Sequence, residues 1–191
     1  MVGRFAMMGV KCAKLVILAG WILAVPLAAT QVRSPSEGTT TMSDREVRGL
    51  PEPIFTELSR EDSARLERQR AVVLAAARQR YGTRALTRTK RDLPVLQNLI
   101  DDKVFNRSQT HEYQSLGVAF GDVLASELPL RWVMVTDEFG TDPTLRFKET
   151  TLQINALTMI SKRVERDEPV NVQWLLDKTR EQLAASEKKF R

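Results

Sequence analysis

The sequence predicts an α+β fold, a small antiparallel three-strand meander packed by helices on one side and preceded by helices. Three observations support this prediction. Residues 59–127 carry apolar side chains at helical spacing, residues 131–157 change to short apolar runs separated by turn residues, and residues 171–188 return to helical spacing. Helices followed by consecutive strands are typical of α+β proteins rather than of alternating βαβ units.

Two helices open the predicted domain. The first spans residues 59–80, with Ser59 as the N-terminal cap and Gly82 just past its end. The second spans residues 92–103, and we expect Asp92 to cap it. Apolar residues recur along one face of each helix, which indicates that both helices border a hydrophobic core.

A third helix is predicted over residues 108–127, and it carries Gly117 and Gly121 four residues apart. Glycine lowers helix stability by about 1 kcal/mol relative to alanine, so a close neighbour on this face is expected. The two glycines permit tight internal packing, which we favour, or a docking groove for a partner.

The predicted sheet follows this helix. Its three strands are short runs rich in apolar and β-branched residues: residues 131–136, 144–148 and 152–157. A short helix over residues 159–166 comes next, and a last helix over residues 171–188 follows it. Asn171 is expected to cap the last helix, whose Trp174 and Phe190 are expected to face inward.

Residues 1–29 predict an export signal. Three basic residues precede an uncharged apolar run over residues 15–29. A membrane-spanning helix needs about twenty apolar residues, so a cleaved signal peptide is favoured over an inner-membrane anchor formed by this run. We therefore expect a periplasmic or otherwise exported protein. If translation began at Met42 instead, the protein would be cytoplasmic.

Residues 30–53 are rich in Ser, Thr, Pro and Gly and predict a disordered linker. Residues 54–191 are then expected to form a single α+β domain, long enough to bury a core. The signal carries three basic residues and no acid, so the net charge of +5 falls to +2 without it. This modest charge argues against a nucleic-acid partner.

Composition excludes several kinds of active site. The one cysteine, Cys12, lies in the predicted signal, and the one histidine is His111. A mature chain without cysteine has no disulfide, thiol nucleophile or thiolate metal ligand, and one histidine cannot build a multi-histidine zinc site. Glycine-rich phosphate-binding motifs are also absent. These exclusions favour a non-enzymatic protein that needs no cofactor or metal.

Basic side chains near the end of the first helix form one candidate binding surface. They are Arg78, Arg80, Arg84 and Arg88. Such a cluster suits an acidic partner or peripheral contact with an anionic membrane surface. The alternative is a solvated helix end, where cations also complement the helix dipole.

Two further groups of charged residues are candidates. A turn is predicted over residues 138–143; Asp137 comes just before it and Asp142 lies within it. The two acids suit partner binding, a carboxylate pair for acid–base chemistry, or only the turn itself. Lys162 and Arg163 suit anion binding or a structural role, such as pairing with those two carboxylates.

Three segments resemble an uncharacterised bacterial family, domain of unknown function 3806. They are QSLGVAFGDVLA at 114–125, WVMVTDEFGTDPTLR at 132–146 and LTMISKR at 157–163. The resemblance covers residues 114–172. It implies one compact α+β domain and carries no reaction, substrate or cofactor with it.

The preferred hypothesis is a non-enzymatic exported domain that binds a protein or another component of the cell envelope. One alternative is a carboxylate-based hydrolase-like enzyme that uses Asp137 and Asp142. Another is a membrane-tethered accessory protein, which requires that the signal stay uncleaved.

Overall fold

The computed structural model of the chain describes residues 52–189. The predicted export signal, the alternative start at Met42, most of the predicted linker and Phe190 lie outside these residues. The elements follow in this order: β1 (Ile54–Thr56), α1 (Arg60–Tyr81), the 3₁₀ turn η2 (Lys90–Asp92), α2 (Leu93–Asp101), α3 (Thr110–Glu127), β2 (Leu130–Asp137), β3 (Gly140–Phe147), β4 (Gln153–Ile154), α4 (Ala156–Met159), α5 (Ser161–Glu165) and α6 (Val172–Lys189).

The structure confirms the α+β class and enlarges the predicted sheet. Four antiparallel strands lie in the order β1-β2-β3-β4, so the predicted three-strand meander corresponds to β2, β3 and β4. The added strand β1 pairs Ile54 with Thr136 and Thr56 with Met134. Three residues are too short to display strand alternation, and the pairing partner lies about eighty residues away, so local sequence gave no signal for it.

The connection between the predicted first and second strands is shorter than expected. Asp137 pairs with Gly140, which leaves only Glu138 and Phe139 in the turn. The residues from Gly140 onward therefore belong to β3 rather than to a six-residue turn. The predicted third strand is also shortened, because α4 begins at Ala156, and the helix predicted over residues 159–166 is divided between α4 and α5.

Helix α1 begins and ends where its sequence predicts. The Ser59 hydroxyl accepts a hydrogen bond from the Asp62 backbone N–H at 3.0 Å, and the Asp62 carboxylate accepts one from the Ser59 backbone N–H. Gly82 ends the helix in a left-handed conformation, φ 68°. These two local signals fix both ends of the longest helix.

Two predicted features of later helices are wrong. Asp92 does not cap α2 through its side chain, because its carboxylate accepts hydrogen bonds from the preceding residues Thr87 and Arg88. Asn171 does cap α6, accepting from the Trp174 backbone N–H at 2.8 Å, but the Trp174 side chain is 43% exposed rather than inward.

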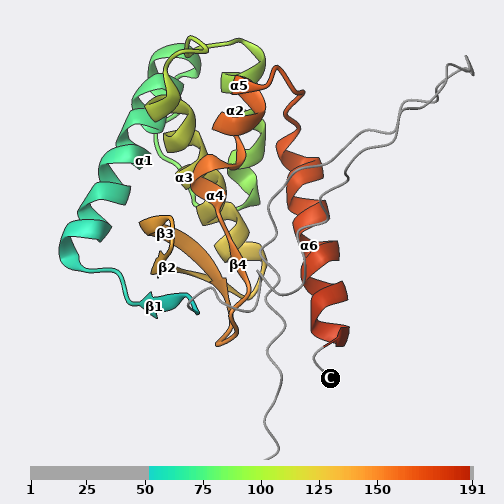
Figure 1. Cartoon of the computed structure of the whole chain (residues 1–191). Coiled ribbons are helices and arrows are strands. Elements are labelled where there is room, and N and C mark those ends of the chain that lie inside the picture. Colours follow the sequence, from blue (N-terminus) through green and yellow to red (C-terminus); the bar gives the residue numbers. More distant parts are fainter. Residues whose placement is uncertain (1–51, 190–191) are drawn as a thin grey trace, which may run out of the picture.

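Helix α3 is the centre of the core. In Figure 1 it lies between α1 and α6, and the sheet lies in the lower half of the view. Its residues from Ser115 to Leu124 are all buried, and it packs against α1, α2, α4, α5 and β2. A continuous buried stretch of this length indicates that neighbours surround the helix, unlike a surface helix with one apolar stripe.

The two glycines of α3 serve internal packing, as favoured above. A Cβ on Gly117 would overlap the backbone carbonyl oxygen of Leu157 at the start of α4. A Cβ on Gly121 would overlap the Trp132 ring of β2. The glycines therefore let α4 and the sheet approach the helix backbone, and atoms of this same chain fill the space beside them.

Among residues 52–189, no helix combines the length and apolar character that a membrane crossing requires.

Candidate functional site

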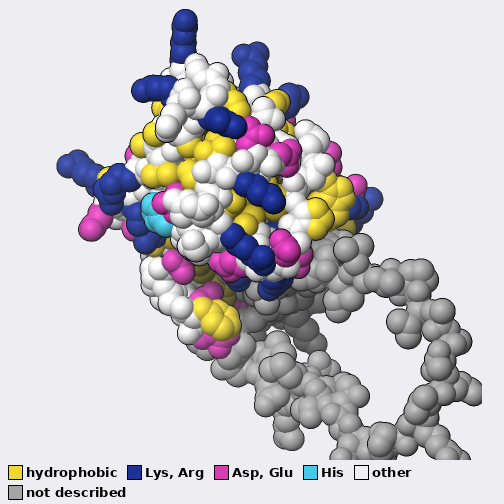
Figure 2. Space-filling view, turned by 90° about the horizontal axis from the view of Figure 1, so that it is seen from above, with side chains coloured by type: hydrophobic (Ala, Val, Ile, Leu, Met, Phe, Trp, Pro, Cys, Tyr) yellow, Lys and Arg dark blue, Asp and Glu magenta, His cyan; other side chains and the backbone are white. Residues whose placement is uncertain are grey.

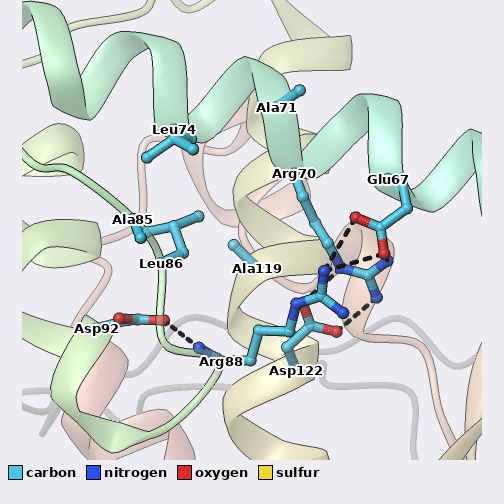
Figure 3. Close-up of a pocket in the computed structure, with 10 residues that line it drawn as sticks. All are labelled: Glu67, Arg70, Ala71, Leu74, Ala85, Leu86, Arg88, Asp92, Ala119 and Asp122. Carbon is cyan, nitrogen blue, oxygen red and sulfur yellow. Dashed lines mark hydrogen bonds and ion pairs between the residues drawn. The ribbon is translucent and has the colours of Figure 1, made fainter.

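A pocket of about 220 Å³ opens between α1, α3 and the segment that joins α1 to α2 (Figure 3). Its lining residues are Glu67, Arg70, Ala71, Leu74, Ala85, Leu86, Arg88, Asp92, Ala119 and Asp122. The side chains divide by character. Figure 3 shows Leu74, Leu86 and the Asp92 carboxylate on one side and a group formed by Glu67, Arg70, Arg88 and Asp122 on the other.

A buried ion pair joins α1 to α3 at the charged end. The Arg70 guanidinium donates from Nε and Nη2 to the two carboxylate oxygens of Asp122, at 2.6 and 2.7 Å. The side chains are only 12% and 7% exposed. Asp122 also accepts a hydrogen bond from Trp132 Nε1 at 3.0 Å. The carboxylate is thus fixed by donors from α1 and from β2.

The pKa of Arg70 lies above its ordinary value. Burial acts to lower it, but the hydrogen bonds and charge of Asp122, with Glu67 adding to them, outweigh the burial. Arg70 is therefore a permanent cation in the pocket, and a bidentate pair of this kind holds both side chains in one geometry.

A second carboxylate bridges two guanidiniums at the pocket entrance. Glu67 accepts from Arg70 Nη1 at 3.1 Å and, through both of its oxygens, from Arg88 Nη2 at 3.0 and 2.9 Å. Glu67 and Arg88 are each about half exposed. Exposed ion pairs are worth about 0–1 kcal/mol, so this bridge opens at little cost, in contrast to the buried pair beneath it.

Arg88 reaches this position from a strained backbone. Its φ is 58°, in the left-handed region that residues other than glycine seldom occupy. The buried Asp92 carboxylate holds the turn, accepting from the backbone N–H groups of Thr87 and Arg88 at 2.9 and 2.7 Å and from the Thr87 hydroxyl at 2.8 Å. Strain of about 1–3 kcal/mol persists only where surroundings impose it, and it is concentrated at functional sites.

The arrangement suits binding more than acid–base chemistry. Asp92 accepts three hydrogen bonds and Asp122 accepts three, so the oxygens of both carboxylates are already engaged by donors of the protein itself. Within the described part of the chain, no three His, Cys, Asp or Glu side chains are grouped so as to hold a metal ion.

The predicted basic residues near the end of α1 are placed in different surroundings. Arg78 donates to the Arg84 backbone oxygen at 3.2 Å, so these two are neighbours. Arg80 lies 3.7 Å from the carboxylate of Asp102, and Arg88 turns toward the pocket. On the face above the helices, Lys and Arg side chains are spread out with Asp and Glu between them (Figure 2).

The predicted acids of the hairpin lie at its tip, away from the pocket. Asp137 accepts a hydrogen bond from the Phe139 backbone N–H at 2.9 Å, and Asp142 is exposed opposite Val135. Neither carboxylate lines the pocket between α1 and α3. Between them, Phe139 is 87% exposed.

Lys162 and Arg163 differ from one another. Lys162 is exposed, whereas Arg163 is 8% exposed and donates to the Met159 backbone oxygen at 2.7 Å. Burial lowers the pKa of Arg163, partly offset by the charge of Glu168. Arg163 thus hydrogen-bonds the end of α4 and not the hairpin carboxylates.

Little of this pocket is predicted from the sequence: Glu67 and Asp122 are not identified, and Arg70 and Arg88 are treated only as members of a group of surface cations. One signal was available. Asp122 interrupts the continuous apolar run of α3, and a buried carboxylate requires a positively charged or hydrogen-bonding partner. The partner itself, Arg70, is 52 residues away and could not be identified by spacing.

The family comparison covers the part of the chain that follows α1 and the segment joining α1 to α2. Residues 92–175 match the family described as a domain of unknown function (DUF3806). Helix α1 and Arg88 lie before this segment, whereas Ala119 and Asp122 lie inside it. The pocket is therefore built jointly by the matched segment and by residues that precede it.

No curated protein matches the chain. The crystal structure of a protein from Bacteroides thetaiotaomicron VPI-5482 has a similar fold, with a TM-score of 0.61 and 14% identity. The similarity covers 69% of this chain and 48% of that protein, so the chain spans about half its length. At this identity the likeness concerns the fold alone. The match over residues 92–175, which are 84 of the 191 residues, confirms the resemblance to this domain of unknown function.

Proposed function

We propose that this chain is a non-enzymatic exported domain that binds another protein of the cell envelope through the tip of the β2–β3 hairpin. One observation carries the proposal: Phe139, a large aromatic residue, is 87% exposed at the end of the hairpin. Aromatic side chains that enter a partner's pocket often dominate binding energy at interfaces.

Local hydrogen bonds and strand pairing constrain the hairpin tip. The turn contains two residues, Asp137 accepts from the Phe139 backbone N–H, and the Thr136 and Thr141 hydroxyls lie 2.9 Å apart across the strands. Such preorganisation reduces the entropy lost on binding, because the aromatic residue is already presented.

The charge around Phe139 favours one class of partner. The carboxylates of Asp137, Glu138 and Asp142 all lie within three residues of it. Acidic side chains are repelled by an anionic membrane surface and attracted by a basic one. The partner that fits is therefore a folded protein with an apolar pocket and a basic rim.

Site-specific photo-crosslinking in cells tests this proposal. A photoreactive phenylalanine analogue would replace Phe139 in one variant and the exposed Gln173 of α6 in a matched control. We expect one dominant protein adduct from position 139 that is absent from position 173. Its loss in a variant that also carries D142K and E138K would support the charge requirement. Equal labelling at both positions, or none at 139, would refute the proposal.

Export is tested separately, because it rests on residues 1–29. The measurement is the intact mass and N-terminus of the native protein after cell fractionation. A periplasmic species that begins at Thr30 supports the proposal. A membrane-bound species with an intact N-terminus supports the tethered alternative, and a species that begins at Met42 contradicts export.

A further inference from the structure

The pocket between α1 and α3 offers a second binding site, distinct from the hairpin tip. We propose that it binds a small organic monocarboxylate with an apolar body, whose carboxylate takes the place of Glu67 between Arg70 and Arg88. The inference does not depend on the protein partner proposed above, because the two sites lie on different elements.

The first support is the convergence of two guanidiniums on one carboxylate. Arg70 and Arg88 both donate to Glu67, at 2.9–3.1 Å. The planar guanidinium matches the geometry of a carboxylate, so the position that Glu67 occupies is one that another carboxylate can take. Glu67 therefore shows where the charged group of a ligand would sit.

The second support is that this exchange preserves the charge balance. Asp122 keeps its three donors and Asp92 keeps its own, so neither is left unpaired when Glu67 leaves. Glu67 is 53% exposed on the surface of α1, and its side chain can turn into solvent. One carboxylate then replaces another beside the same two cations.

The third support is the apolar wall that continues from the charged end. It is formed by Ala71, Leu74, Ala85, Leu86 and Ala119. A ligand that carried charge alone would leave this wall uncovered, whereas a short hydrocarbon body would bury it. The volume of about 220 Å³ suits a body of only a few carbon atoms.

The strained turn at Arg88 explains why the site is formed in advance. Asp92 holds Thr87 and Arg88 by three hydrogen bonds, and the resulting left-handed backbone of Arg88 directs its side chain toward Glu67. Arg88 is thus a fixed component of the pocket, although its guanidinium is half exposed.

The test is a titration of the full chain with hexanoate at pH 7, followed by NMR of the Leu74 and Leu86 methyl groups. Hexanamide has nearly the same shape without the charge, and inorganic phosphate has charge without the apolar body. We expect saturable shifts with hexanoate and none with hexanamide at equal concentration. Equal responses to hexanamide, or equally tight saturation by phosphate, would overturn the assignment.

Variants of the bridging residues give opposite expected effects. R88Q should weaken the binding of hexanoate about tenfold, because a charged hydrogen-bond donor is lost. E67Q should strengthen the binding of hexanoate about threefold, because the carboxylate that competes with the ligand is replaced by a neutral amide. R84Q makes the same charge change in the same segment outside the pocket and should leave binding unchanged. An R88Q affinity equal to that of R84Q, or no gain in E67Q, would refute the site.

Discussion

Helix α3 is packed in two different ways on its two sides. Toward α4 and β2, Gly117 and Gly121 bring backbone and ring atoms so close that no Cβ fits. Toward α1, the buried pair of Arg70 and Asp122 joins the helices beside an open pocket. Contact through glycine excludes any ligand, whereas contact through long charged side chains spaces the helices and leaves room for one.

Among substitutions on the two sides of α3, D122A is expected to lower the unfolding free energy most. Arg70 would lose its bidentate partner while 12% exposed, and Trp132 Nε1 would lose its acceptor. Removing one partner of a buried ion pair costs about 3–5 kcal/mol, and Glu67 still contacts Arg70, so we expect a loss of about 3 kcal/mol. Urea unfolding measures it.

D122N is the matched variant, since it removes the charge and keeps an oxygen that can accept from Trp132. Its loss of unfolding free energy should lie between zero and that of D122A. If D122A lost less than about 1 kcal/mol, the ion pair would not be what holds α1 against α3.

A smaller effect is expected on the opposite side of α3 from G117A. The added methyl group would overlap the Leu157 carbonyl oxygen and lie 2.9 Å from its carbon, both in backbone that cannot turn away. Overpacking costs about 1–3 kcal/mol, and alanine returns about 1 kcal/mol of helix propensity. Because the added methyl group would overlap backbone atoms, we take the upper end of the overpacking range and expect a net loss of about 2 kcal/mol by urea unfolding.

The control for G117A is S126A, an exposed substitution near the end of the same helix. It should change the unfolding free energy by less than about 0.5 kcal/mol. A G117A protein as stable as the wild type would mean that α4 moves freely on α3, contrary to the contrast drawn above.

The parts of the fold that sequence predicts are those fixed by local chemistry. Ser59 and Gly82 mark the ends of α1, as the structure confirms. Asp92 shows the limit of such prediction. An aspartate just before a helix can cap that helix or hold the turn before it, and the sequence is the same in both cases. The structure shows the second role, because the Asp92 carboxylate accepts from the Thr87 backbone N–H.

The candidate site depends on contacts between distant residues, and sequence predicted little of it. Arg88 meets Glu67 across 21 residues and Arg70 meets Asp122 across 52. In each pair the two residues lie on different segments of the fold, so no periodic pattern within one element indicates the pair. The exposure of Phe139 likewise follows from a turn of two residues where six were expected.

The smallest effect is expected where α1 begins, at S59A. The Ser59 hydroxyl caps the helix that carries Glu67 and Arg70, and removing an N-terminal cap costs about 1 kcal/mol. The hydrogen bonds from Ser59 to the Asp62 carboxylate also lower the pKa of that carboxyl. A lowered folded pKa gives stability that is present above the unfolded pKa and lost as pH falls through the folded value.

S59A should therefore be less stable than the wild type near pH 7 and should lose less stability on acidification, because much of the pKa difference at Asp62 is gone. Unfolding free energies measured by urea at pH 7 and near pH 3 give both quantities. If the difference in unfolding free energy between the wild type and S59A were as large near pH 3 as at pH 7, Asp62 would not contribute through its ionised carboxylate. The cap would then act through the Ser59 hydroxyl alone.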